Sequence, residues 1–166
     1  MRRAWVLAVA AFLVAGCGNS SHPRRSADLT FETLGDTSGL SQGTPLLRSL
    51  EPYRLSNGLV RVRGTVDFPD GTRLQVSIYR KEDHALVARM QMPVEQGKFD
   101  SPPVLGPRGP LPRGDYVFEL LTYFNQTWQP ANVMVAGHGG LELHGPGMSR
   151  DRAGDAVFRM TRESAL

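Results

Sequence analysis

The sequence predicts an all-β fold, a β-sandwich, for residues 46–166. Several short segments alternate apolar and polar side chains with a period of two, which is the pattern of half-buried strands. Turn-forming residues separate these segments, and nothing beyond the first 16 residues has three turns of amphipathic helical pattern. Short strands between frequent turns are typical of two packed antiparallel sheets.

The first 16 residues are predicted to be a signal peptide. Arg2 and Arg3 supply a positively charged start, and an apolar run of about a dozen residues follows. This run is shorter than the roughly 20 residues that a membrane-spanning helix needs. It ends in Val14-Ala15-Gly16-Cys17, and Cys17 is the single cysteine of the chain. We therefore expect an exported protein.

The motif that ends at Cys17 resembles the processing site of bacterial lipoproteins. The resemblance implies that a peptidase cuts before Cys17, which then carries acyl chains such as palmitate. Several acyl chains hold a protein on a bilayer better than one does. We expect a protein of the cell envelope, lipid-anchored to a membrane, and Gly18 after the cysteine fits the outer membrane of a two-membrane bacterium. The alternative is an ordinary secretory signal with an incidental cysteine.

Residues 17–45 are predicted to be the lipidated cysteine followed by a flexible, disordered tether. They are rich in Ser, Gly, Thr, Asp and Arg and show neither helical nor strand periodicity. A flexible chain of this length has an end-to-end distance of roughly 30 Å. Residues 46–166 are near the commonest domain size, so one domain is expected after the tether.

The charge pattern does not favour nucleic acid as a partner. The whole chain has 19 basic and 16 acidic residues, and loss of Arg2 and Arg3 with the signal leaves 17 against 16. Binding to nucleic acid needs a clustered basic face. We therefore expect the partners to be the membrane, through the anchor, and an envelope protein or a glycan.

Two strands are predicted over residues 60–66 and 74–79. Their apolar positions are Val60, Val62, Val66, Leu74, Val76 and Ile78. The sequence Pro-Asp-Gly-Thr at residues 69–72 lies between them, and its proline and glycine suit a tight turn. These observations predict that the two strands form a hairpin.

Further strands are predicted along the rest of the chain. Their ranges are residues 85–94, 98–101, 115–124, 132–136, 141–143 and 156–161. Residues 102–112 contain five prolines and two glycines, which predicts an extended loop over one end of the sheets. The start Gly114-Asp115-Tyr116 resembles a tyrosine corner, in which the phenol bonds back to an earlier backbone group.

Three motifs together resemble a family of uncharacterised bacterial proteins, secreted or lipid-anchored, that carry an immunoglobulin-like domain. The motifs are residues 64–74, with the Pro-Asp-Gly-Thr turn, residues 97–99 and residues 111–116. The resemblance covers the chain from about residue 58 onward and implies an immunoglobulin-like β-sandwich. It carries no catalytic residue, because the motifs consist of turn and strand residues.

Two motifs suggest a catalytic or metal-binding role. Residues 39–43 spell the G-x-S-x-G pattern of a nucleophile elbow around Ser41, but they lie in the predicted tether, where the required strand and helix are missing. In a strand, Glu142 and His144 would share a face, and a glycine bend could bring His138 beside them. Two imidazoles and a carboxylate suit zinc. The alternative to a zinc site is an exposed hairpin whose outward positions are polar. We favour this alternative, so no metal and no cofactor is expected.

Tyr123, Phe124 and Trp128 are candidates for an exposed aromatic binding patch, although such residues more often cap a core. The proline-rich loop of residues 102–112 and the segment of residues 123–129 are the expected partner surface. The sequence as a whole predicts an envelope lipoprotein whose domain is a non-catalytic binding or structural module. The alternative is a metal-binding or hydrolytic envelope enzyme that uses His138, Glu142 and His144.

Overall fold

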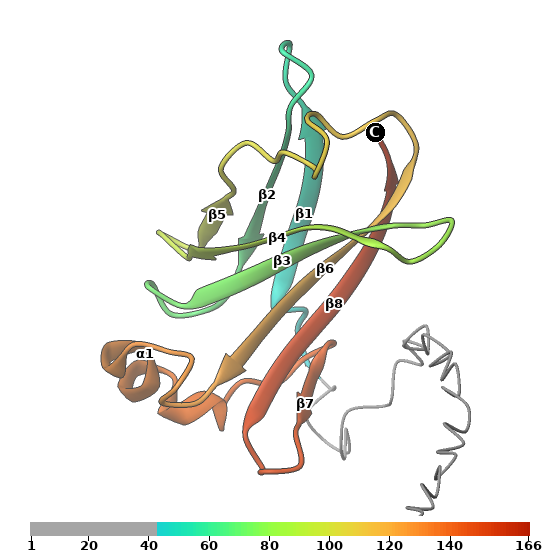
Figure 1. Ribbon diagram of the computed structural model, residues 1–166. Coiled ribbons are helices and arrows are strands. Elements are labelled where there is room, and N and C mark those ends of the chain that lie inside the picture. Colours follow the sequence, from blue (N-terminus) through green and yellow to red (C-terminus); the bar gives the residue numbers. More distant parts are fainter. Residues whose placement is uncertain (1–42) are drawn as a thin grey trace, which may run out of the picture. The chain divides into compact units, whose positions relative to one another are not determined.

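The computed structural model describes residues 43–166, and their strands form two antiparallel sheets (Figure 1). The all-β prediction is confirmed. The predicted signal peptide, Cys17, Ser41 and most of the predicted tether lie outside the described residues. Within residues 43–166, no helix is long and apolar enough to cross a membrane.

The smaller sheet has three strands in the order β1-β2-β5. These strands are β1 (Leu47–Arg54), β2 (Val60–Val66) and β5 (Lys98–Asp100). Strand β2 is central and shows the predicted alternation, since Val60, Val62 and Val66 are buried while Arg63 is exposed. Strand β1 is an edge strand, which is where Pro52 is tolerated because its missing N–H costs no ladder bond there.

The larger sheet has five strands in the order β4-β3-β6-β8-β7. These strands are β3 (Arg73–Arg80), β4 (Leu86–Pro93), β6 (Asp115–Phe124), β7 (Met148–Arg150) and β8 (Ala156–Ala165). The two long strands β6 and β8 pair along their whole length, from Asp115 opposite Ala165 to Phe124 opposite Ala156. The predicted inward residues of β6, which are Tyr116, Phe118 and Leu120, are buried.

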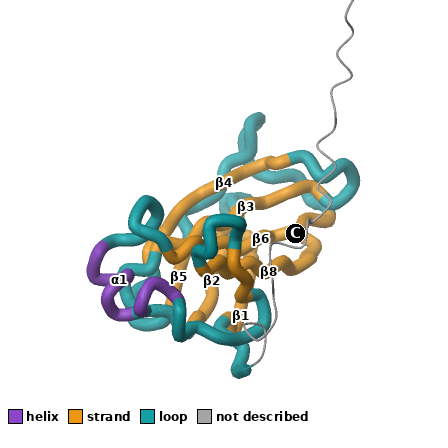
Figure 2. The backbone as a smooth tube through the Cα atoms, turned by 90° about the horizontal axis from the view of Figure 1, so that it is seen from below, coloured by secondary structure: helices purple, strands orange, loops and turns teal. Residues whose placement is uncertain are grey.

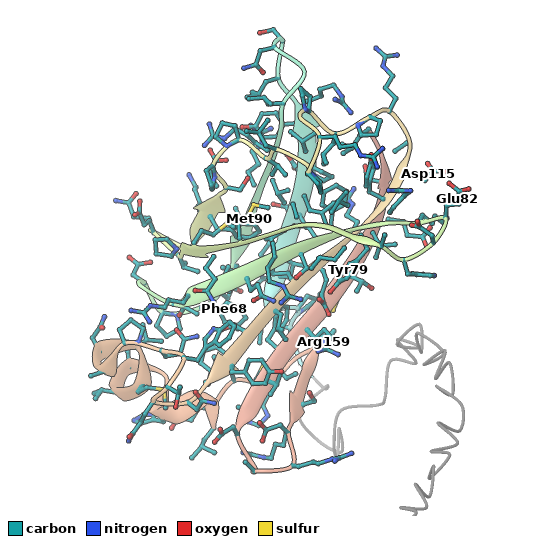
Figure 3. The ribbon with its side chains drawn as sticks, viewed as in Figure 1. Phe68, Tyr79, Glu82, Met90, Asp115 and Arg159 are labelled. Atoms are coloured by element: carbon teal, nitrogen blue, oxygen red, sulfur yellow. The ribbon has the colours of Figure 1, made fainter. Side chains whose placement is uncertain are left out.

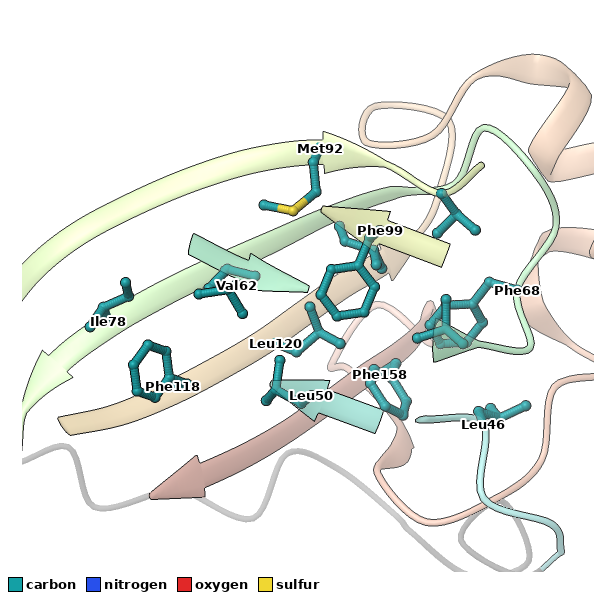
Figure 4. Packing of buried hydrophobic residues seen from close by; sticks show 14 of the residues in the cluster. Leu46, Leu50, Val62, Phe68, Ile78, Met92, Phe99, Phe118, Leu120 and Phe158 are labelled. Atoms are coloured by element: carbon teal, nitrogen blue, oxygen red, sulfur yellow. The ribbon is translucent and has the colours of Figure 1, made fainter. Parts of the chain in front are cut away.

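The two sheets form two layers, as the backbone in Figure 2 shows, and they share one hydrophobic core, whose side chains are seen from close by in Figure 4. Leu50, Val62 and Phe99 come from the three-stranded sheet. Ile78 and Phe118 come from the five-stranded sheet, together with Leu120 and Phe158. Apolar burial of this kind stabilises by about 25 cal/mol per Å², so neither sheet is expected to be stable without the other.

The predicted hairpin of residues 60–79 is wrong. Strand β2 pairs with β1 and β5, whereas β3 pairs with β4 and β6 in the other sheet. The physical reason lies at Phe68, whose ring packs edge-on against Phe158 with 5.0 Å between centroids. This contact holds the connection inside the core, where the chain crosses from one sheet to the other. Alternation of apolar and polar residues with a period of two identifies half-buried strands. It does not tell whether two such strands lie in one sheet or in facing sheets.

The strands predicted at residues 132–136 and 141–143 are also wrong. The chain there forms a short helix, α1 (Ala131–Ala136), and a 3-10 turn, η1 (His138–Gly140). The carbonyl of Pro130 accepts hydrogen bonds from the N–H groups of Val133 and Met134, which starts the helix. Val133 is the only buried residue of this helix. The apolar alternation that predicted a strand was therefore misleading, because a single buried side chain attaches the segment to the core.

Candidate functional site

The proline-rich loop that joins β5 to β6 is the predicted surface feature with the most defined geometry. At its start, Ser101 and Val104 donate backbone hydrogen bonds to the carbonyls of Val62 and Val60, at 2.8 and 2.7 Å. The loop thus continues along β2 after β5 ends. Val104 is 3% exposed and Leu111 is 2% exposed, so two apolar side chains anchor the loop in the core.

The end of the loop is held by a tyrosine and an arginine. The hydroxyl of Tyr116 donates to the carbonyl of Pro112 at 2.9 Å, which confirms the predicted tyrosine corner. The guanidinium of Arg54 donates to the carbonyls of Leu111 at 2.8 Å and Pro112 at 3.2 Å. It also donates to the carbonyl of Gly58 at 2.7 Å. Sequence reasoning missed Arg54, because strand β1 was itself missed.

The middle of the loop is a tight turn. Gly106 and Gly109 exchange two backbone hydrogen bonds, at 2.7 and 3.2 Å. Pro107 and Arg108 lie between these two glycines. Gly109 has a φ of +110°, which a residue with a side chain rarely adopts. Arg108 therefore lies in a tight turn whose two ends are joined by hydrogen bonds.

A cavity of about 860 Å³ lies between this loop and the end of the β3–β4 hairpin. The loop wall runs from Gly106 to Gly114, and the facing wall includes residues 80–82 with Leu86 and Val87. Figure 3 shows Glu82 and Asp115, two acidic lining residues, at this end of the five-stranded sheet. The volume is within the range of about 300–1,000 Å³ that is usual for ligand sites.

The cationic side chains of the cavity differ in their partners. Arg80 pairs with Asp83 at 3.2 Å, and Lys81 pairs with Glu163 at 2.5 Å. The hydrogen bond to Glu163 and the charge of that carboxylate raise the pKa of Lys81 above its ordinary value of 10.5, so Lys81 is charged at neutral pH. Arg108 and Arg113 have no hydrogen bond or ion pair with any residue that the structure describes.

Two of the three predicted zinc ligands, His138 and Glu142, are brought together, and His144 does not join them. His138 lies in η1 and its Nδ1 is 2.8 Å from the Glu142 carboxylate, with the two side chains 63% and 73% exposed. His144 is exposed beyond the turn, and no group of three His, Cys, Asp or Glu side chains suited to a metal occurs within residues 43–166. The shared face required a strand, and the glycines at 139 and 140 instead adopt positive φ in a turn.

The three predicted aromatic residues divide between core and surface. Phe124 is 1% exposed and packs against Phe68 with 5.5 Å between ring centroids, so it offers no surface to a partner. Tyr123 and Trp128 are half-buried and their rings lie 5.3 Å apart. The indole N–H of Trp128 donates to the carbonyl of Arg73 at 3.2 Å. This bond holds Trp128 at the start of β3.

A polar cluster on the outer face of the five-stranded sheet was not predicted. Glu119 is only 7% exposed, and the hydroxyl of Tyr79 donates to its carboxylate at 3.1 Å. The Arg159 Nε lies 3.1 Å from the other carboxylate oxygen. Figure 3 shows Tyr79 and Arg159 near one another on this face. The outward position of Glu119 in β6 was readable from the alternation, but the depth of its burial was not.

No family model, curated protein or solved structure matches this chain.

Proposed function

We propose that this chain is a bacterial envelope lipoprotein whose β domain is a non-catalytic binding module of immunoglobulin-like type. The observation that carries the binding role is the cavity of about 860 Å³ beside the proline-rich loop. Its loop wall is held in advance by Arg54 and Tyr116, so little conformational entropy remains to be lost when a partner binds.

Two features support the immunoglobulin-like form. Two antiparallel sheets share one core, and Tyr116 makes the corner bond at the start of a central strand. The number and order of the strands, three against five, are this domain's own. Sandwiches host many unrelated functions, so the binding role depends on the cavity and not on the fold.

The anchor and the binding domain would act together. Acyl chains on Cys17 would keep the domain at the membrane, and the tether of residues 17–45 would let it reach a partner nearby. Confinement of this kind raises the effective concentration of the domain at the membrane. A Cys17→Ser variant is expected to leave the membrane fraction, and a variant that stays membrane-bound would contradict the lipid anchor.

The binding role is tested by crosslinking of the tagged protein in its native envelope, followed by mass spectrometry of what is attached. The test variant replaces Pro107, Arg108 and Pro110 with serine and keeps Gly106, Gly109 and the buried anchors of the loop. The control is Lys98→Ala, an exposed change on β5 outside the cavity. One dominant partner that the test variant loses and the control keeps supports the proposal. A partner that survives in both, or no specific partner, contradicts it.

The zinc or hydrolytic alternative remains distinguishable by experiment. It would need His144 to join His138 and Glu142, which lie together without it. Calorimetric titration with zinc is the direct test. A heat of binding at micromolar zinc that is lost in the His138→Ala/His144→Ala variant would support the alternative.

A further inference from the structure

We infer that the ligand of the cavity is an acidic peptide segment of a partner protein, whose carboxylates are bound by Arg108 and Arg113. This inference rests on the proposed binding function and gives its ligand a chemical class. It follows from the charges, the lining and the rigidity of the cavity walls, taken in turn.

The charges of the cavity leave two guanidinium groups for a ligand. Arg80 and Lys81 are already engaged by Asp83 and Glu163, whereas Arg108 and Arg113 are exposed and unpaired across the described residues. A guanidinium presents parallel N–H donors that match a carboxylate in a bidentate manner. Both free arginines belong to the loop wall, so the carboxylates of a ligand would face the loop.

The remaining lining suits the neutral parts of a peptide. Leu86 is 46% exposed at the start of β4, which leaves an apolar side chain open beside the cavity. Pro107 and Pro110 add rigid apolar surface on the loop wall. Glu82 and Asp115 also line the cavity and would repel carboxylates, so the carboxylates of an acidic segment would be directed to Arg108 and Arg113.

The lining favours peptide over sugar. Among the described residues that line the cavity, the only aromatic one is Tyr116, which is 2% exposed and whose hydroxyl donates to the carbonyl of Pro112. It therefore presents no open ring face on which a sugar could stack. A peptide needs no such face, since its side chains and charges can be met by Leu86 and the two arginines.

Hydrogen bonds of the loop fix the backbone at both arginines. Arg108 lies in the turn closed by Gly106 and Gly109, and Arg113 directly follows Pro112, whose carbonyl is held by Arg54 and Tyr116. Their backbones are thus positioned before the ligand arrives. Preorganised charges lose less entropy on binding than charges on a free loop.

The test uses the full-length protein in detergent micelles and a peptide with fluorescein on its N-terminus, fluorescein-Ala-Glu-Ala-Glu-Ala-amide. Fluorescence anisotropy gives its Kd for the unchanged protein and for the Arg108→Gln/Arg113→Gln variant, which we expect to bind at least tenfold more weakly. The control is Arg89→Gln, which removes one arginine charge from β4 outside the cavity and should leave the Kd unchanged. The peptide with Gln in place of Glu should bind at least tenfold more weakly than the acidic one.

Three outcomes would overturn the inference. These are no binding of the acidic peptide, an equal loss of affinity in Arg89→Gln, and binding of soluble cell-wall fragments in its place. If the crosslinked partner of the native envelope is retained by Arg108→Gln/Arg113→Gln but lost by the serine replacement of the loop, the proposed function stands and the acidic ligand does not. Loss of the partner in both variants supports both.

Discussion

At the scale of single residues, Gly64 in β2 has the least room for a side chain among the glycines that the structure describes. A Cβ at this position would lie 2.2 Å from the carbonyl oxygen of Ser49 and 2.4 Å from the ring of Phe99. Neither neighbour can move easily, because Ser49 belongs to the paired strand β1 and Phe99 is 3% exposed. Only a residue without a side chain fits between them.

We therefore expect Gly64→Ala to lower the free energy of unfolding by about 1–3 kcal/mol or more, as overpacking does. The midpoint of urea unfolding measures the change. The control is Arg63→Ala on the same strand, which removes an exposed ion pair with Glu51 and should cost less than about 1 kcal/mol. Equal midpoints for the unchanged protein and Gly64→Ala would contradict the packing argument.

The hydroxyl of Tyr116 is the second residue-scale prediction. Its ring is 2% exposed, so Tyr116→Phe keeps the packing and removes only the bond to the Pro112 carbonyl. We expect a loss of about 1 kcal/mol, the usual net value of one hydrogen bond. Thermal unfolding measures it, with Tyr53→Phe as the control because no hydrogen bond of the Tyr53 hydroxyl is found within residues 43–166. An equally small effect of both changes would contradict a stabilising tyrosine corner.

At the scale of elements, the proline-rich loop depends on Arg54 in strand β1. This guanidinium donates to three carbonyls, two of which belong to the loop. Hydrogen bonds from charged donors contribute about 1.5–3 kcal/mol each, and their loss would let the loop open more often. We expect Arg54→Met to raise the rate of trypsin cleavage after Arg108 and Arg113 about tenfold, which corresponds to about 1.4 kcal/mol of local stability.

The control for this cleavage is Arg48→Met, which removes an exposed arginine from the same strand where it pairs with Asp67. Its loop should be cleaved at the rate of the unchanged protein. If Arg48→Met and Arg54→Met accelerate cleavage equally, the effect belongs to strand β1 as a whole and not to the bonds of Arg54. In that case the positioning role of Arg54 is wrong.

Elements were predictable where one face is buried and the alternation is clean. Strand β6 was predicted with its bounds, since Tyr116, Phe118 and Leu120 repeat without interruption. Strand β1 was missed because only Leu50 of its eight residues is buried, so no alternation appears in its sequence. Sheet membership was beyond the sequence, because the crossing between sheets depends on ring contacts of Phe68 with residues more than 50 positions away.

The candidate site was predicted only in part for a similar reason. The composition of residues 102–112 marked the loop, and Tyr116 marked its corner. The facing wall of the cavity, with Arg80 and Leu86, comes from a hairpin whose place beside the loop is a tertiary contact. No local pattern in either segment encodes that contact.

At the scale of the whole described domain, the two sheets are linked through one core and across their inner faces. Phe158 of β8 packs against Phe68, which follows β2, and the guanidinium of Arg162 in β8 donates to the carbonyl of Leu50 in β1 at 2.6 Å. Removal of one sheet would expose the apolar face of the other to water. A domain of this size with a single core usually unfolds in one cooperative transition.

We therefore expect β2 and β8, one from each sheet, to lose protection against hydrogen exchange at the same urea concentration. Mass spectrometry of peptides from residues 60–66 and 156–165, labelled at increasing urea, measures both midpoints in one sample. The short edge strand β7 serves as the internal comparison, because its three residues pair only with β8 and should open earlier by local fraying. If β2 lost protection at a urea concentration well below the midpoint of β8, the three-stranded sheet would be a separate unfolding unit. The loop wall of the cavity, which Arg54 of that sheet holds, would then lose its support before the whole domain unfolds.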